Sequence, residues 1–236
     1  KAQPGMQIDI SGGGLHVRDG VLARGSEKIA FDGALRGGSS VQGTLRASGF
    51  DLDAVKYVLE EQSPGVRRAF FSGTADVALD LSGSLSDPRY RASVRAHDVL
   101  VRDMLLGEVE GDLTYADHSL NGRVTAADRS GSPPQLVVEG GIPMNLDLIG
   151  DAPAGIANQP ADLTIRASRF QLAALDPFLP AFDEFVGSLD ADLRLTGPIR
   201  NPRYAGTFSV ADGSFLFEPN NIRYTFNGDF RASGER

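Results

Sequence analysis

Apolar and polar residues alternate along most of the chain with a period of two. In the segment GTADVALDL (73–81), every odd-numbered residue from Ala75 to Leu81 is apolar, whereas Thr74, Asp76 and Asp80 are polar. The same alternation marks the segments 6–10, 29–35, 108–115, 120–126, 188–196 and 222–231. Because successive side chains of a strand point to opposite faces, each segment is predicted to be a β-strand with one apolar and one polar face.

Two parts of the chain repeat each other. FSGTADVALDLSGSLSDPRY (71–90) and FVGSLDADLRLTGPIRNPRY (185–204) are identical at nine of twenty positions, at an offset of 204 − 90 = 114. Further upstream, LRASGFDLDAV (45–55) and IRASRFQLAAL (165–175) agree at six of eleven positions, at an offset of 165 − 45 = 120. We therefore expect one continuous repeat segment over 1–236, with a partial repeat 1–44, a repeat 45–162 and a truncated repeat 163–236. Because the chain begins and ends within strand-like patterns, we expect it to be a segment of a longer protein.

SGSLSDPRY (82–90) and TGPIRNPRY (196–204) are predicted to reverse the chain direction. Asp87-Pro88 and Asn201-Pro202 favour turns, because the residue before proline is driven out of the helical region and Asp or Asn can bond its own backbone. Another alternating run follows each turn. The motif therefore predicts a hairpin of two antiparallel strands in each repeat.

Two segments break the strand period and predict a short helix in each repeat, packed at the same place on the sheet. In FDLDAVKYVLEEQSPG (50–65), apolar residues follow at helical spacing after an N-cap at Asp51 or Asp53, and Pro64-Gly65 provides a stop. The counterpart FQLAALDPFLPAF (170–182) is shortened by Pro177 and Pro180. The expected fold is thus all-β, an elongated and curled antiparallel sheet with an apolar concave face and one or two short helices.

Composition and charge exclude several classes of protein. The net charge of −8 and pI near 4.9, with positive charges spread singly among the acids, argue against nucleic acid as a partner. No run of about eighteen apolar residues is present, so no transmembrane helix is expected. The chain has no Cys, which excludes disulfide and thiolate chemistry.

Residues suited to catalysis or metal binding are sparse. His16, His97 and His118 fall in separate strands or turns without metal-ligand spacing, and we interpret them as isolated surface histidines. The acids Asp76, Asp80, Asp190 and Asp192 stand on the polar face of predicted strands. Neither a nucleophile-elbow pattern nor a phosphate-binding loop pattern occurs. We therefore expect no enzymatic activity, no catalytic or metal-binding residues and no cofactor.

One longer pattern resembles a known family. The succession F-x-L-x-x-L followed by G-x-L-x-x-x-L-x-L-x-G-x-x-x-[DN]-P-x-Y-x-G occurs in 170–210 and more loosely in 50–96. It is similar to the repeats of TamB-type translocation and assembly module proteins, which belong to the AsmA-like group of bacterial relatives of bridge-like lipid transfer proteins. The resemblance covers nearly the whole chain and is clearest over 45–100 and 163–217.

The resemblance implies a fold, a location and partners. The fold is a taco-like sheet, an open half-pipe, in the periplasm of a protein that an N-terminal helix, absent from this sequence, anchors to the inner membrane. The implied partners are phospholipid, whose acyl chains the groove carries between the two membranes, and an Omp85-type (TamA-like) outer-membrane protein, which the C-terminal region of the full-length protein engages. An alternative role within the family is to assist the assembly of outer-membrane proteins.

The residues expected to line this groove are apolar positions of the predicted strands and form the candidate site: Val77, Leu79, Leu81, Val94, Leu189, Leu193, Leu195, Phe208, Val210, Phe215, Phe217, Tyr224, Phe226 and Phe230. If a second sheet covered this face, the same residues would be the core of an ordinary sandwich. A different hypothesis is a scaffold that captures a client strand at an open sheet edge. An outer-membrane β-barrel is disfavoured, because no Trp and only five Tyr provide no aromatic girdle.

Overall fold

The computed structural model describes residues 5–54, 71–101, 104–149, 155–178 and 182–234. They form one antiparallel sheet of fourteen strands that does not close on itself. The strands and two 3₁₀ helices are, in order, β1(Gln7–Ser11), β2(Gly14–Arg24), β3(Glu27–Arg36), β4(Ser40–Asp51), η1(Leu52–Ala54), β5(Phe71–Ser84), β6(Asp87–Val101), β7(Met104–Ala116), β8(Ser119–Ala127), β9(Leu136–Asn145), β10(Gly155–Ile156), β11(Pro160–Gln171), η2(Leu172–Phe178), β12(Phe182–Pro198), β13(Arg203–Phe217) and β14(Ile222–Ala232). The prediction of an elongated, curled, open antiparallel sheet is confirmed.

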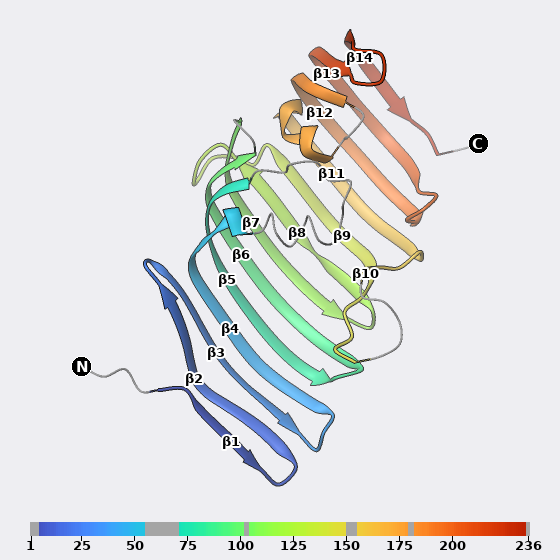
Figure 1. Ribbon diagram of the computed structural model, residues 1–236. Coiled ribbons are helices and arrows are strands. Elements are labelled where there is room, and N and C mark those ends of the chain that lie inside the picture. Colours follow the sequence, from blue (N-terminus) through green and yellow to red (C-terminus); the bar gives the residue numbers. More distant parts are fainter. Residues whose placement is uncertain (1–4, 55–70, 102–103, 150–154, 179–181, 235–236) are drawn as a thin grey trace.

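The sheet is a meander in which each strand pairs with the next along the chain. The strand order runs from β1 to β9 and then β11 to β14, and the two-residue β10 pairs with β9 off this path. Figure 1 shows the result, a long curved ribbon of strands with the chain termini at opposite ends. Consequently β1 and β14 are the two edges of the sheet among the described strands.

The two matching sequence blocks occupy equivalent elements. Strand β11 begins and ends 120 residues after β4, since 160 − 40 = 171 − 51 = 120. Each is followed directly by a 3₁₀ helix, η1 or η2, and each then pairs with the next long strand, β5 or β12. The sequence repeat is therefore also a repeat of structure.

Both predicted chain reversals are present. Ser84 pairs with Asp87 across the turn between β5 and β6, and Thr196 pairs with Arg203 across the turn between β12 and β13. The tyrosines that end the two motifs, Tyr90 and Tyr204, lie in the returning strands, as the sequence predicts.

The expected helices begin where predicted, but they are 3₁₀ helices. Both pack at the same place, against the strand that follows in each repeat, β5 for η1 and β12 for η2. The segment η2 continues through Pro177 to Phe178. Of the first helix only Leu52–Ala54 is described, and the remainder of the predicted segment, up to the Pro64-Gly65 stop, lies outside the described residues.

Strand register places apolar residues in continuous rows across one face. Residues paired across neighbouring antiparallel strands share a face. One row therefore contains Gly20, Phe31, Leu45, Leu79, Ala92, Leu113, Gly122, Gly140, Leu163, Leu195 and Tyr204. A Cβ added at Gly20 would lie 2.5 Å from Cε2 of Phe31, so the glycine leaves room for the neighbouring ring.

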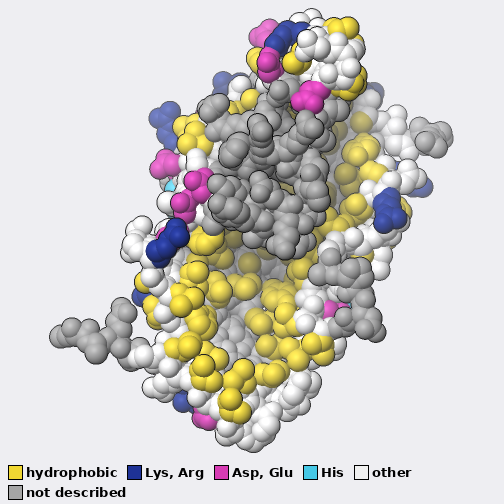
Figure 2. Space-filling view, viewed as in Figure 1, with side chains coloured by type: hydrophobic (Ala, Val, Ile, Leu, Met, Phe, Trp, Pro, Cys, Tyr) yellow, Lys and Arg dark blue, Asp and Glu magenta, His cyan; other side chains and the backbone are white. Residues whose placement is uncertain are grey.

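The adjacent row on the opposite face is polar. It contains Thr44, Asp80, Arg91, Thr114, Asn121, Gly141, Asp162, Thr196 and Arg203. Figure 2 shows the apolar face, where hydrophobic side chains gather in the hollow of the curl and charged side chains lie mainly at the margins. The sheet is thus two-faced along its length.

Buried residues concentrate next to the two 3₁₀ helices. One cluster contains Ala75, Ala96, Val99 and Val101, with Leu52 of η1 packed against it. The equivalent cluster in the second repeat contains Ala167, Phe170 and Ala174 of η2. Each helix therefore closes a small hydrophobic core over part of the apolar face.

Candidate functional site

The curl of the sheet coincides with a series of β-bulges. Strands β2, β4, β6, β11 and β13 each contain a register shift, and in each shift one residue has a left-handed backbone: Asp19, Gly49, Asp98, Arg169 and Asp212. A bulge bends its strand and increases the local twist. The bulges therefore help to turn a flat sheet into a trough.

Acidic or amide side chains fix four of these bulges. The Gly49 N–H donates to Asp76 Oδ1 at 3.0 Å, and the Arg169 N–H donates to Asp190 Oδ1 at 3.0 Å. These two contacts occupy equivalent positions in the repeats. Asp32 and Asn227 accept from the bulge N–H groups of Asp19 and Asp212 in the same way. Asp76 and Asp190, predicted to be solvated surface acids, thus also shape the sheet.

The concave apolar face forms the candidate site, and we call it the apolar groove. Near the N-terminal end of the sheet it contains a cavity of about 360 Å³. Its apolar lining comes from strands β2 to β5: Leu15, Val17, Phe31, Leu35, Val41, Leu45, Leu79 and Leu81. Such a surface can hold a flexible hydrocarbon by burial alone, because the hydrophobic effect has no directional requirement.

The C-terminal end of the groove is aromatic. The rings of Phe208 and Phe230 stack with centroids 4.8 Å apart, and those of Phe215 and Tyr224 stack at 5.5 Å. Phe185 also stacks on Phe215, at 5.4 Å. The groove therefore changes from aliphatic lining in the first repeat to an aromatic ladder across β12 to β14.

Residues 145–149 cross the apolar face near the turns that join β5 to β6 and β7 to β8, and we call this segment the strap. Tyr90 and Tyr115 lie on the apolar face, and both hydroxyls bond the backbone of Leu146. The Tyr90 hydroxyl donates to the Leu146 carbonyl at 3.0 Å, while the Tyr115 hydroxyl accepts from the Leu146 N–H at 3.0 Å. Leu148 then donates to the Leu85 carbonyl at the turn after β5. Burial raises the pKa of Tyr90, with smaller contributions from Tyr115 and Asp147.

All fourteen predicted lining residues lie on the apolar face according to the strand register. Leu79 and Leu81 line the aliphatic cavity. Val210 is buried, whereas Tyr224 and Phe230 are each 42% exposed at the C-terminal edge. The predicted set is therefore aliphatic in β5 and β6, whereas in β12 to β14 it combines aliphatic and aromatic side chains.

Other residues of this face were missing from the predicted set. Phe31, Leu45, Leu113 and Leu163 occupy the same row as Leu79. Their alternation in the sequence could have identified them. The strap has no such signal, because its position depends on hydrogen bonds to two distant tyrosines.

The polar face carries cross-strand ion pairs. Glu139 on β9 accepts from Arg123 and Arg166 on the two neighbouring strands, each at 2.9 Å. Arg194 bonds Asp162 with two nitrogens and holds the pKa of that carboxyl below its usual range. These contacts join neighbouring strands across the polar face. The three histidines are not isolated, in contrast to the prediction. His97 Nδ1 lies 2.5 Å from Glu108 Oε2, Arg18 bonds His16 Nδ1 at 3.2 Å, and His118 Nδ1 lies 3.6 Å from Asp147 Oδ1.

No protein-family model matches the chain, and no solved structure matches it. The described part of the chain contains no group of three or more His, Cys, Asp or Glu side chains able to hold a metal ion. Within the described ranges, no helix combines the length and apolar character needed to cross a membrane. Function is therefore inferred from the sheet and its two faces.

Proposed function

We propose that this chain is a periplasmic segment of a membrane-bridging protein, and that its apolar groove shields phospholipid acyl chains during transport between the inner and outer membranes. The observation that carries the proposal is the two-faced open sheet, with apolar rows on the concave side and ion pairs on the other. The resemblance of its repeats to TamB-type proteins supports the periplasmic setting, an inner-membrane anchor and an Omp85-type partner for the longer protein.

The apolar groove suits a mobile hydrocarbon better than a fixed ligand. Burial of one CH₂ group contributes about 0.8 kcal/mol, so a chain of about sixteen carbons gains on the order of 10 kcal/mol. This gain is similar to the cost of taking the chain from a bilayer into water. Because the apolar rows continue from strand to strand, an acyl chain can move along them without losing its shielding. The lining residues need no catalytic chemistry for this role.

Site-specific photo-crosslinking tests the proposal with neighbouring residues as matched controls. A photoreactive side chain at Leu79 or Leu193 faces the groove, whereas one at Asp80 or Arg194 faces the opposite side. After incubation with phospholipid vesicles, we expect lipid adducts at the two leucine positions and few at the two polar positions. Equal labelling at all four positions would contradict the groove hypothesis.

A second candidate function is strand capture at the sheet edge. It is favoured by β1, one edge of the sheet among the described strands, where the side chains of Ile8 and Ile10 are 57% and 79% exposed. A client strand could pair with this edge through backbone hydrogen bonds. If so, Ile10→Pro should abolish binding of a client strand and leave the lipid adducts at Leu79 intact. If the chain is only a lipid conduit, the β1 edge binds no client strand and the variant should change neither measurement.

A further inference from the structure

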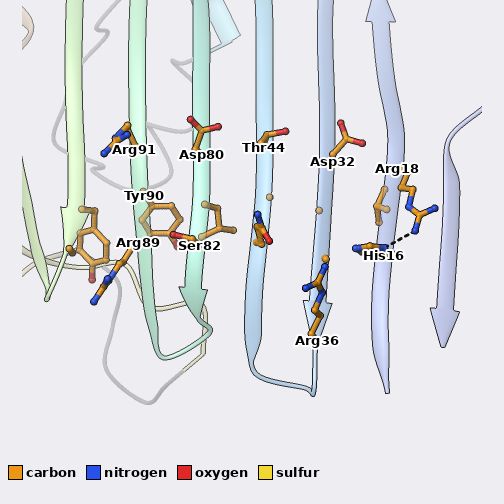
Figure 3. Close-up of a pocket in the computed structure, with 18 of the residues that line it drawn as sticks. His16, Arg18, Asp32, Arg36, Thr44, Asp80, Ser82, Arg89, Tyr90 and Arg91 are labelled. Carbon is orange, nitrogen blue, oxygen red and sulfur yellow. Dashed lines mark hydrogen bonds between the residues drawn. The ribbon is translucent and has the colours of Figure 1, made fainter. Parts of the chain in front are cut away.

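The polar face contains a second concave site that the lipid-groove proposal does not use. It is a hollow of about 750 Å³ across strands β2 to β7, on the opposite side of the sheet from the apolar groove. Figure 3 shows Arg89 and Arg91 projecting from β6, Arg36 from β3, and Arg18 next to His16 on β2. Three strands, β2, β3 and β6, thus bring four guanidinium groups to one hollow.

These four arginines have no carboxylate partner among the described residues. Elsewhere on the polar face some arginines pair closely with acids, as Arg123 does with Glu139 and Arg194 with Asp162. No described carboxylate oxygen lies within 4.0 Å of a guanidinium nitrogen of Arg18, Arg36, Arg89 or Arg91. The four differ from other such arginines because they lie together in one hollow, in a chain of net charge −8.

The two acids of the hollow are already bonded elsewhere. Asp80 accepts from Arg46 at 2.8 Å, although Arg91 is its cross-strand neighbour. Asp32 accepts from the backbone N–H of Asp19 in the β2 bulge, at 2.9 Å. The lining therefore holds four arginines against two acids. Neutral hydrogen-bonding side chains complete it: Gln42, Thr44, Ser82 and Thr114.

The spacing of the arginines sets the size of a matching ligand. Arg89 and Arg91 are two residues apart on one strand, so their backbones are separated by about 7 Å. Neighbouring strands lie about 4.8 Å apart, which places Arg36 about 14 Å and Arg18 about 19 Å across the sheet from β6. A single phosphate group cannot reach all four guanidinium groups. An extended anion with several charged groups can.

We propose that this hollow, the arginine hollow, binds a soluble anion that carries several phosphate groups. The planar fork of arginine matches phosphate oxygens with two parallel hydrogen bonds. Each phosphate group brings up to two negative charges and three acceptor oxygens, which favours it over a single carboxylate in an acidic protein. The concave shape fits a discrete molecule rather than a flat bilayer surface. This proposal does not depend on lipid transport.

Isothermal titration calorimetry with orthophosphate, pyrophosphate and tripolyphosphate tests the proposal on the intact chain. We expect affinity to increase with the number of phosphate groups and to fall as salt concentration rises. The double variant Arg89→Gln, Arg91→Gln should weaken tripolyphosphate binding by at least about tenfold. The matched control Arg203→Gln, Arg231→Gln removes the same charge from β13 and β14, and should bind as the parent chain does.

Three results would overturn the proposal. They are absence of tripolyphosphate binding, an equal loss of binding in the control variant, and binding to phosphatidylglycerol vesicles without binding to tripolyphosphate. The pair Arg18→Gln, Arg36→Gln provides a second test on different strands, and circular dichroism confirms folding of each variant. Because these variants leave the apolar face unchanged, lipid crosslinking at Leu79 should persist in all of them.

Discussion

The side chains that fix the bulges provide the sharpest test of how the sheet is shaped. Asp190 on β12 accepts the N–H of Arg169, which has a left-handed backbone with φ of 48° inside the β11 bulge. Asp190→Ala removes this acceptor and leaves the N–H to bond water. A hydrogen bond of this kind contributes about 0.5–1.5 kcal/mol. The equilibrium constant for opening of the Arg169 N–H should therefore increase by about 2- to 12-fold.

Native-state hydrogen exchange measured by NMR reports this change at one amide. We expect faster exchange at Arg169 in Asp190→Ala, and an unchanged rate at Gly49, the equivalent bulge in the first repeat. Asp76→Ala should give the reverse pattern, because Asp76 bonds Gly49. Asp190→Asn keeps an acceptor oxygen at the same place and should restore most of the protection.

Asp112→Ala provides a matched control. Asp112 is an exposed acid on the polar face of β7, and its side chain makes no hydrogen bond or ion pair within the described residues. Its removal changes the net charge by the same amount as Asp190→Ala but leaves the bulges intact. If Asp112→Ala accelerated exchange at Arg169 as much as Asp190→Ala does, the effect would be general electrostatics and the bulge argument would fail.

Three further predictions concern the strap, the core under η2 and the polar face. Tyr115→Phe removes the acceptor for the Leu146 N–H at a cost of about 1–3 kcal/mol, and exchange of the Leu146 amide should accelerate accordingly. Phe170, only 3% exposed, packs under η2, so Phe170→Ala should lower the free energy of unfolding in urea by about 3–5 kcal/mol. Because the folded pKa of Asp162 is lowered, its ion pair stabilises the fold above the unfolded pKa of about 3.9, and this contribution is lost as pH falls through the folded pKa. An NMR titration of the Asp162 carboxyl should show its pKa return to about 3.9 in Arg194→Gln.

Much of the architecture could be predicted from local sequence. Alternation identified most of the strands, and the Asp-Pro and Asn-Pro motifs located the turns after β5 and β12, because both signals depend on residues close together in the chain. Alternation did not identify β2, β9, β10 or β11. The apolar face followed from the same alternation. All fourteen candidate residues lie on this face, since residues paired across neighbouring antiparallel strands point to the same side of the sheet.

The strap and the arginine hollow could not be predicted in this way. The strap depends on hydrogen bonds between the Leu146 backbone and the hydroxyls of Tyr90 and Tyr115, and Leu146 is 56 residues from Tyr90 along the chain. The arginine hollow combines side chains from β2, β3 and β6. In the sequence, these arginines are simply positive charges on polar strand positions. Strand pairing and curvature must be known before either feature becomes visible.

The bulges explain why the period-two pattern of apolar residues breaks a few residues before each 3₁₀ helix begins. The pairs Ala47↔Val77 and Phe50↔Ala75 show that β4 advances three residues while β5 advances two, so one residue is added without a change of face. Apolar positions therefore move from odd numbers, Leu45 and Ala47, to the even number Phe50. The second repeat makes the same shift between Ala167 and Phe170. If a strict period of two is required, the residues from Phe50 onward are predicted to belong to a helix, although β4 continues to Asp51.

A spacing of three between apolar residues, with a Gly, Asp or Arg just before the second, is thus a sequence signal for a bend rather than for the end of a strand. It occurs at Ala96 and Val99 with Asp98 between them, and at Val210 and Gly213 with Asp212 between them. Because the shift keeps the apolar residues on one face, each bulge curves the sheet without interrupting the groove. Curvature and continuity of the apolar surface therefore arise from the same local feature.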